Sequence, residues 1–256
     1  MSRLPIALAA VAALSACATS GDGAGHSEAA LTAPRGVDRS ARERIAREDM
    51  LTQMAFWAGE YQTFPNDLEA AQRFAEALRR GGRTDRAAQV ASEALGRFPE
   101  DRALLMTYGM SQVAAGRAQA ALRPLALVAA AENDNWRARS ALGAALDQLS
   151  RFDDARRAYQ EALAIQPGDP RILTNLGVSH IMAGDPEAAE PILRDAASTA
   201  GAPPEARQNL AIALALQGKF DEAERIERMD LPPAQAAANI QYLRGLLSDP
   251  RRWGDL

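Results

Sequence analysis

The sequence has little cysteine, histidine, lysine or aromatic residue: one Cys, two His, one Lys and 5% aromatic side chains in 256 residues. One cysteine excludes a disulfide framework, and with two histidines it provides too few ligands for a zinc finger or an iron–sulfur centre. Basic residues do not outnumber acidic ones, 29 against 33, so no overall positive field attracts nucleic acid. We therefore expect no nucleic-acid partner, no metal and no cofactor.

Alanine is what the sequence has in abundance, with 57 residues. Alanine has the highest helix propensity, whereas strands favour β-branched and aromatic side chains. The balance of 47% hydrophobic against 24% charged residues is ordinary for a globular protein. The composition predicts an all-α fold whose helices approach each other closely over small side chains.

The first 16 residues have the form of an export signal: a short basic start, an apolar stretch over 4–14 and then small residues. The apolar stretch is shorter than the roughly 20 residues that a membrane-spanning helix needs. Residues 14–17, Leu-Ser-Ala-Cys, resemble the bacterial lipobox, and this resemblance implies cleavage before Cys17 and acylation of that residue. Two alternatives are secretory cleavage after Ala18 and an uncleaved N-terminus.

The residues after the cysteine suggest where an anchored protein resides. In lipoproteins of this kind an Asp directly after the Cys retains the protein at the inner membrane, and here that residue is Ala18. The resemblance thus implies a lipid-anchored protein on the periplasmic face of the outer membrane. Residues 17–38 are rich in Gly, Ser and Ala without an apolar period, which indicates a flexible linker.

Small residues and proline recur every 34 residues over most of the chain. In the clearest copy, Trp136, Gly143, Ala155, Tyr159 and Pro167 follow one another with the spacing of the tetratricopeptide repeat, which this segment resembles. The resemblance implies a solenoid of antiparallel helix pairs. The register predicts five repeats within 68–231, namely 68–101, 102–135, 136–169, 170–203 and 204–231.

Two positions of each repeat are small throughout. The eighth residues are Ala75, Gly109, Gly143, Gly177 and Ala211, and the twentieth are Ala87, Ala121, Ala155, Ala189 and Ala223. We predict that the eighth and twentieth residues face each other where the two helices of a repeat come closest, because only a small side chain fits there. Larger apolar residues at the seventh and twenty-fourth positions are predicted to form the core.

The segments that flank the repeats are also helical in pattern. Residues 39–64 have helical periodicity and no internal breaker, which predicts one helix or a degenerate repeat of two. Residues 233–248 follow two prolines and place apolar side chains on one face. They predict a C-terminal capping helix that covers the open end of the array.

The repeat geometry implied by the resemblance places one face of each first helix on a concave groove. This face is apolar and rich in methionine in three repeats, which suits a bound amphipathic helix or extended peptide. Packing of these side chains against neighbouring repeats is the alternative. The predicted groove residues are Met106, Met110, Val113, Arg137, Arg171, Asn175, Val178, Ile181, Met182, Asn209 and Ile212.

Two polar residue types in this set suggest specific contacts. The arginines Arg137 and Arg171 are candidates to meet acidic groups of a partner, although surface arginines usually only solvate a face. The asparagines Asn175 and Asn209 are candidates to bond a peptide backbone, with capping or helix–helix bonding as the alternative. His180 falls at a core position, where we expect a packed, hydrogen-bonded histidine. No catalytic arrangement of residues is present, and we expect a protein without enzymatic activity.

The C-terminal part carries a more specific resemblance. Residues 208–244, above all Leu-Pro-Pro-Ala-Gln-Ala-Ala-Ala-Asn at 231–239, are similar to the TadD-type tetratricopeptide repeat lipoproteins of the tight-adherence (Flp) pilus assembly system. The resemblance implies a non-enzymatic adaptor that binds a secretin or another pilus-assembly component. The alternative from the sequence is a scaffold lipoprotein for outer-membrane protein assembly or polysaccharide export.

Overall fold

The structure, a computed structural model, describes residues 38–248, which form thirteen helices and no strand. The prediction of an all-α fold is confirmed. The described part from Arg44 onward forms one compact unit. The helices are α1 (Arg39–Ile45), α2 (Met50–Thr63), α3 (Leu68–Arg80), α4 (Thr84–Leu95), α5 (Arg102–Ala114), α6 (Ala118–Ala131), α7 (Trp136–Gln148), α8 (Phe152–Ile165), α9 (Pro170–Met182), α10 (Pro186–Ser198), α11 (Pro204–Leu216), α12 (Phe220–Glu227) and α13 (Pro233–Ser248).

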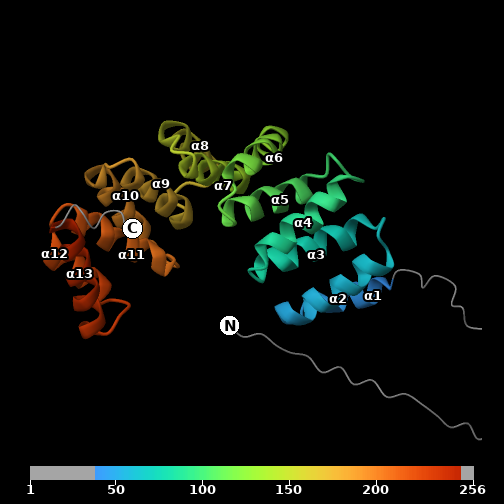
Figure 1. The fold of residues 1–256 in the computed structure, drawn as a ribbon, viewed down its shortest axis with the longest axis horizontal. Helices are drawn as coiled ribbons and strands as arrows, with labels where there is room; N and C mark the ends of the chain where they lie inside the picture. Colours follow the sequence, from blue (N-terminus) through green and yellow to red (C-terminus); the bar gives the residue numbers. More distant parts are fainter. Residues whose placement is uncertain (1–37, 249–256) are drawn as a thin grey trace, which may run out of the picture. The chain divides into compact units, whose positions relative to one another are not determined.

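Helices α3 to α12 are arranged as five successive pairs. Each helix from α2 to α13 packs against the next one along the chain, and the first helices of the pairs, α3, α5, α7, α9 and α11, also contact one another in sequence. The second helices make no such contacts with each other within the described residues. The first helices consequently follow the inner side of an arc and the second helices its outer side (Figure 1).

The helix starts are fixed by local sequence signals. The side chains of Asp67, Asp101, Asn135 and Asp169 precede α3, α5, α7 and α9, and each accepts a hydrogen bond from a backbone N–H of the first turn. The pairs turn at the fifteenth repeat position, where the backbone has a positive φ. Four repeats have glycine there and the third has Ser150, with a φ of 57°.

The core between paired helices is built on small residues, as the composition predicts. The alanines at the twentieth position are fully buried. The predicted partner of the eighth position is wrong in the second, third and fourth repeats, however. A Cβ added to Gly109, Gly143 or Gly177 would lie 2.4–2.6 Å from the nearest atom of the twenty-fourth residue, and these residues are Leu125, Tyr159 and Leu193. In these three repeats the rotation of the helices about their own axes therefore points the eighth position at a large side chain.

The ends of the array are closed by flanking helices. The segment 39–64 holds two helices, α1 and α2, with Asp49 capping the start of α2. Trp57 of α2 is buried in one hydrophobic cluster with Phe74 of α3. At the other end α13 packs on α12 and α11, and Ile240 and Leu246 are buried. Both terminal first helices thus have a neighbour on each side.

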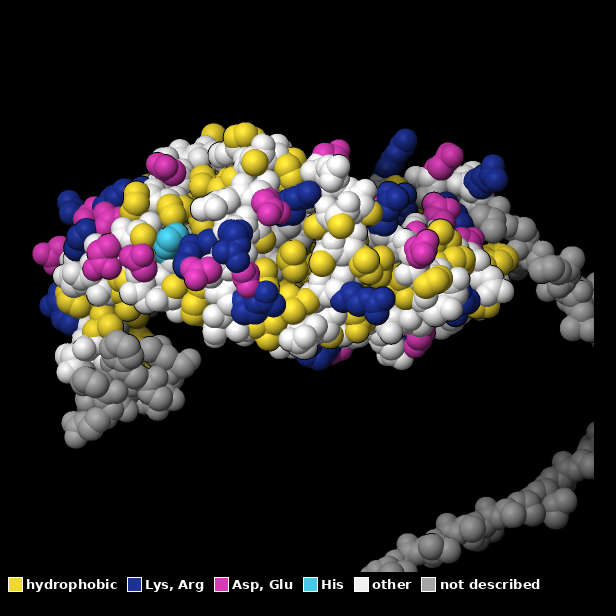
Figure 2. Space-filling view, turned by 90° about the horizontal axis from the view of Figure 1, so that it is seen from above, with side chains coloured by type: hydrophobic (Ala, Val, Ile, Leu, Met, Phe, Trp, Pro, Cys, Tyr) yellow, Lys and Arg dark blue, Asp and Glu magenta, His cyan; other side chains and the backbone are white. Residues whose placement is uncertain are grey.

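The outer surface is mixed in charge. On the face shown in Figure 2, Lys and Arg side chains alternate with Asp and Glu side chains, with hydrophobic atoms between them. Within residues 38–248, no helix has both the length and the apolar character needed to cross a membrane. Cys17, the signal segment 1–16 and nearly all of the predicted linker 17–38 lie outside the described residues.

Candidate functional site

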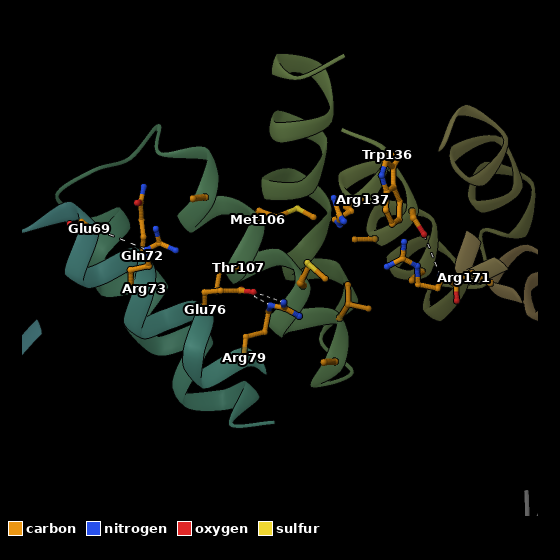
Figure 3. Close-up of a pocket in the computed structure, with 18 residues that line it drawn as sticks. Glu69, Gln72, Arg73, Glu76, Arg79, Met106, Thr107, Trp136, Arg137 and Arg171 are labelled. Atoms are coloured by element: carbon orange, nitrogen blue, oxygen red, sulfur yellow. Dashed lines mark hydrogen bonds and ion pairs between the residues drawn. The ribbon is translucent and has the colours of Figure 1, made fainter. Parts of the chain in front are cut away.

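The first helices α3, α5, α7 and α9 together line an open groove with a volume of about 930 Å³. Figure 3 shows side chains from all four helices converging on it, with the charged residues of α3 on one side and Trp136, Arg137 and Arg171 on the opposite side. A groove in this size range can accept side chains of a bound peptide. The arrangement therefore defines a candidate protein-binding surface.

The apolar part of the groove comes from α5. Met106, Met110 and Val113 are half-buried and pack on the hydrophobic cluster around Ala121 and Leu125. They thus have a packing role and also face the groove. Unbranched methionine side chains can adjust to irregular partner surfaces, so this strip can accept apolar residues of different shapes.

One end of the groove carries an indole flanked by two guanidinium groups. The Cζ atoms of Arg137 and Arg171 lie 4.4 Å and 4.7 Å from the centre of the Trp136 ring. Arg171 also donates to Asp169, with Nη2 to Oδ2 at 2.6 Å, and this pairing lowers the pKa of the nearly buried Asp169 carboxyl. Cation–π contact with Trp136 fixes both arginines at the groove surface.

The opposite wall has charges that are matched within α3. Arg79 donates to both carboxylate oxygens of Glu76, at 2.8 Å and 2.7 Å, and this pairing raises the pKa of Arg79. Arg73 lies 4.0 Å from Glu69. These i,i+3 and i,i+4 pairs balance the four charged residues of α3 that line the groove.

Asn175 lies on α9, one helical turn after Arg171, and lines the groove at that end. Its Nδ2 donates a long hydrogen bond, 3.3 Å, to Oγ of Ser140 on the neighbouring first helix. Helix–helix bonding, the alternative from the sequence, is thus present, and the amide still lines the groove.

Six of the eleven predicted groove residues line this single groove: Met106, Met110, Val113, Arg137, Arg171 and Asn175. The other five lie further along the array. Ile181 contributes to a separate apolar pocket with residues of α11, α12 and α13. Met182 is 49% exposed at the end of α9. Val178, Asn209 and Ile212 are half-buried on α9 and α11.

The contact of the Trp136 ring with Arg137 and Arg171 was not predicted from the sequence, in which Trp136 is only the opening residue of a repeat. The available signal was arginine at the second position of two consecutive repeats, Arg137 and Arg171, since adjacent first helices bring equivalent positions together. The sequence gives no side-chain rotamers, so the stacking itself was not predictable.

A buried polar cluster lies behind the groove. Asp147 is 5% exposed and accepts hydrogen bonds from Tyr159 Oη at 2.9 Å and Ser179 Oγ at 2.6 Å. Burial raises the pKa of Asp147 in spite of these bonds. Asp147 on α7 is thus hydrogen-bonded to residues of α8 and α9, and the cluster holds these three helices together.

His180 departs from its expectation. It is half-buried, as predicted, but its Nδ1 is 3.8 Å from Oδ2 of Asp185 and has no hydrogen-bond partner among the described residues. Burial and the nearby Arg156 lower the pKa of His180. Over residues 38–248, His, Cys, Asp and Glu form no cluster of three or more that could hold a metal ion.

The fold and the groove define a class of protein, a helical-repeat scaffold with a concave binding surface. Sequence profiles described as tetratricopeptide repeat match residues 72–135, 126–170 and 140–206, and another so described matches 180–247. The chain belongs to the tetratricopeptide repeat family.

Individual relatives agree with this assignment. The chain is 35% identical over 123 residues to TPR repeat-containing protein PA4667 of Pseudomonas aeruginosa. The match covers 48% of this chain and 21% of that protein, so the chain spans about a fifth of the length of this relative.

Solved structures show the same fold at lower identity. A tetratricopeptide repeat protein from Parabacteroides merdae superposes with a TM-score of 0.62 and 12% identity, covering 80% of this chain and 81% of that one. TTC0263 of Thermus thermophilus superposes with a TM-score of 0.59 and 21% identity, covering 71% of this chain and 99% of that one. MamA of Desulfovibrio magneticus superposes with a TM-score of 0.55 and 21% identity, covering 62% of this chain and 89% of that one. These similarities concern the fold.

Proposed function

We propose that this protein is an adaptor that binds a segment of another protein in the groove of α3, α5, α7 and α9. Tetratricopeptide repeats generally mediate protein–protein interaction, which supports this class of function. The observation that carries the proposal is the groove itself: a half-buried, methionine-lined strip on α5 beside charged and aromatic side chains. Apolar surface with a few polar anchors is typical of peptide recognition.

The proposed site of action is the periplasmic face of the outer membrane, with a lipid anchor on Cys17. The lipobox resemblance and Ala18 support it. The similarity of 208–244 to TadD-type lipoproteins supports a role in tight-adherence (Flp) pilus assembly. The partner would then be a secretin or another pilus-assembly component, and the protein would act without catalysing a reaction.

The groove is tested by capture of pilus-assembly proteins from cells that express tagged variants. Met106→Asp with Met110→Asp places two charges on the apolar strip and should abolish recovery of the secretin, measured by mass spectrometry. Leu127→Asp is the matched control, because Leu127 is 48% exposed on α6 and does not line the groove. Circular dichroism of both proteins verifies that they stay helical. Undiminished capture by the double variant would contradict the groove assignment.

The anchor is tested in parallel with Cys17→Ser. Loss of acylation should move the protein out of the outer-membrane fraction and reduce secretin recovery. Each buried methylene of an acyl chain contributes about 0.8 kcal/mol to membrane binding, so the unacylated protein should leave the membrane almost completely. An unchanged distribution would exclude Cys17 as the anchor.

The second candidate is a scaffold lipoprotein for outer-membrane protein assembly or polysaccharide export. It shares the groove and the anchor but differs in partner. Recovery of outer-membrane assembly or export proteins, sensitive to the same double variant, would favour it over the pilus system.

A further inference from the structure

We propose that the groove selects partner segments that carry acidic side chains at the end facing Trp136, Arg137 and Arg171 and apolar side chains over α5. The inference rests on the proposed function, because it names the chemistry of the segment that the groove binds. It concerns the partner's charge and direction, neither of which the repeat fold determines.

The charges of the groove are unequal along its length. On α3, Arg79 is neutralised by Glu76, and Arg73 lies near Glu69. At the other end, Arg171 is paired with Asp169, whereas Arg137 has no carboxylate partner among residues 38–248 and contacts the Trp136 ring. The groove therefore has a net positive charge at its α7–α9 end, although the whole chain has a net charge of −4.

The arginines at this end are held in place before a partner arrives. Arg137 and Arg171 both lie over Trp136, and Arg171 is further held by Asp169. A side chain fixed in this way loses less conformational freedom on binding. Arg171 already binds Asp169 through Nε and Nη2. The planar guanidinium fork of Arg137 matches the geometry of a carboxylate and can bind it with two parallel hydrogen bonds. An acidic side chain is thus the group that this end recognises best.

The dimensions of the groove set the length of the segment. Packed helices lie about 8–10 Å apart, so the three spacings from α3 to α9 correspond to about 24–30 Å. A helix rises about 1.5 Å per residue, so this distance takes about 16–20 helical residues. An extended chain covers it in about eight residues. Apolar contacts over α5 and acidic contacts over α7 and α9 then lie one to two helix spacings apart.

A selection from random peptides tests both parts of the inference. A phage-displayed library of random 16-residue peptides is panned against the purified 256-residue chain. We expect the enriched peptides to combine apolar residues with Asp or Glu grouped toward one end. Their affinity for Arg137→Glu should fall about tenfold or more, and panning against this variant should enrich Lys and Arg instead. Arg137 is exposed and, among residues 38–248, its guanidinium group pairs only with the Trp136 ring, so the substitution should leave the fold intact.

Arg123→Glu is the matched control, since Arg123 is exposed on α6, outside the groove, and the change alters net charge by the same amount. The inference is overturned if the library yields no binders, if acidic residues are not enriched, or if Arg137→Glu and Arg123→Glu weaken binding equally. Apolar binders without acidic residues that are lost in Met106→Asp with Met110→Asp would overturn this inference and leave the proposed function standing. Retention of all binders by that double variant would overturn both.

Discussion

The second and third repeats share a backbone arrangement but differ in the chemistry of their cores. In both, a glycine at the eighth position lets the first helix approach a large residue at the twenty-fourth. That residue is Leu125 opposite Gly109 and Tyr159 opposite Gly143. The tyrosine brings a hydroxyl group into the interior, and burial raises its pKa. The third repeat must therefore supply a buried acceptor, and Asp147 is that acceptor.

The consequence extends to the neighbouring repeat. Ser111 and Ser179 occupy the same repeat position, and both are fully buried. Ser179 donates to Asp147, whereas Ser111 Oγ has no hydrogen-bond partner in the described chain. The residue that corresponds to Asp147 in the first repeat is Arg79, which is bonded to Glu76. Whether the buried serine of a repeat has a hydrogen-bond acceptor thus depends on a residue of the preceding repeat.

Among the changes that test this comparison, removal of Asp147 should lower the free energy of unfolding most. Asp147→Ala leaves the Tyr159 and Ser179 hydroxyls buried without their acceptor, which should lower the free energy of unfolding by about 2–4 kcal/mol. Thermal or urea denaturation followed by circular dichroism measures it. Asp147→Ala combined with Tyr159→Leu, which copies the second repeat, should recover part of the loss. A single variant as stable as wild type would show that the cluster contributes nothing.

Filling the close approach in the third repeat should have the next largest effect. The Cβ of Gly143→Ala would lie 2.6 Å from the Tyr159 ring, so the buried ring or the helices must shift. Overpacking of this kind costs about 1–3 kcal/mol. Gly59→Ala on α2 is the control, because its Cβ meets nothing within 4 Å and should stabilise the helix by about 0.5–1 kcal/mol. Similar melting temperatures for the two variants would refute the packing explanation.

The sequence predicts the repeat fold well because the signals that set it are local. Aspartate caps, turn glycines and buried alanines recur with the 34-residue period. It fails at the partner of the eighth position, because the period does not reveal how far each helix is rotated about its axis.

The candidate site, too, could be predicted only in part. Helical spacing brings Met106 and Met110 to the groove. The Trp136 stack and the placement of Ile181 in another pocket depend on side-chain packing between repeats. Such contacts do not produce a periodic pattern in the sequence.

The two equivalent serines should respond in opposite directions. Ser179→Ala removes a donor to the buried Asp147 carboxylate and should cost about 1–2 kcal/mol. Ser111→Ala removes a hydroxyl that has no partner among the described residues, so stability should be unchanged or rise by about 0.5 kcal/mol. The two melting temperatures, measured under the same conditions, make the test. Equal losses would mean that the hydrogen bond to Asp147 does not distinguish the two repeats.

A carboxylate with charged partners offers the opposite case to Asp147. Glu190 on α10 accepts hydrogen bonds from Lys219 at 2.6 Å and Arg194 at 2.8 Å, and these contacts, Lys219 first, lower its pKa from 4.5 to about 2. A lowered pKa in the folded state stabilises the protein above pH 4.5, and this contribution is lost as the pH falls toward 2. The raised pKa of Asp147 has the reverse effect, because its ionisation above pH 3.8 disfavours the folded state.

Glu190→Gln should therefore reduce stability by about 1 kcal/mol at neutral pH, as for a partly exposed ion-pair network. The difference from wild type should shrink as the pH is lowered from 4.5 to about 2. Urea denaturation at a series of pH values measures it, with Glu187→Gln as the control, since Glu187 is exposed on the same helix and forms no ion pair within residues 38–248. A difference that stays constant with pH would mean that Glu190 stabilises the repeats through packing or neutral hydrogen bonds, and not through its charge.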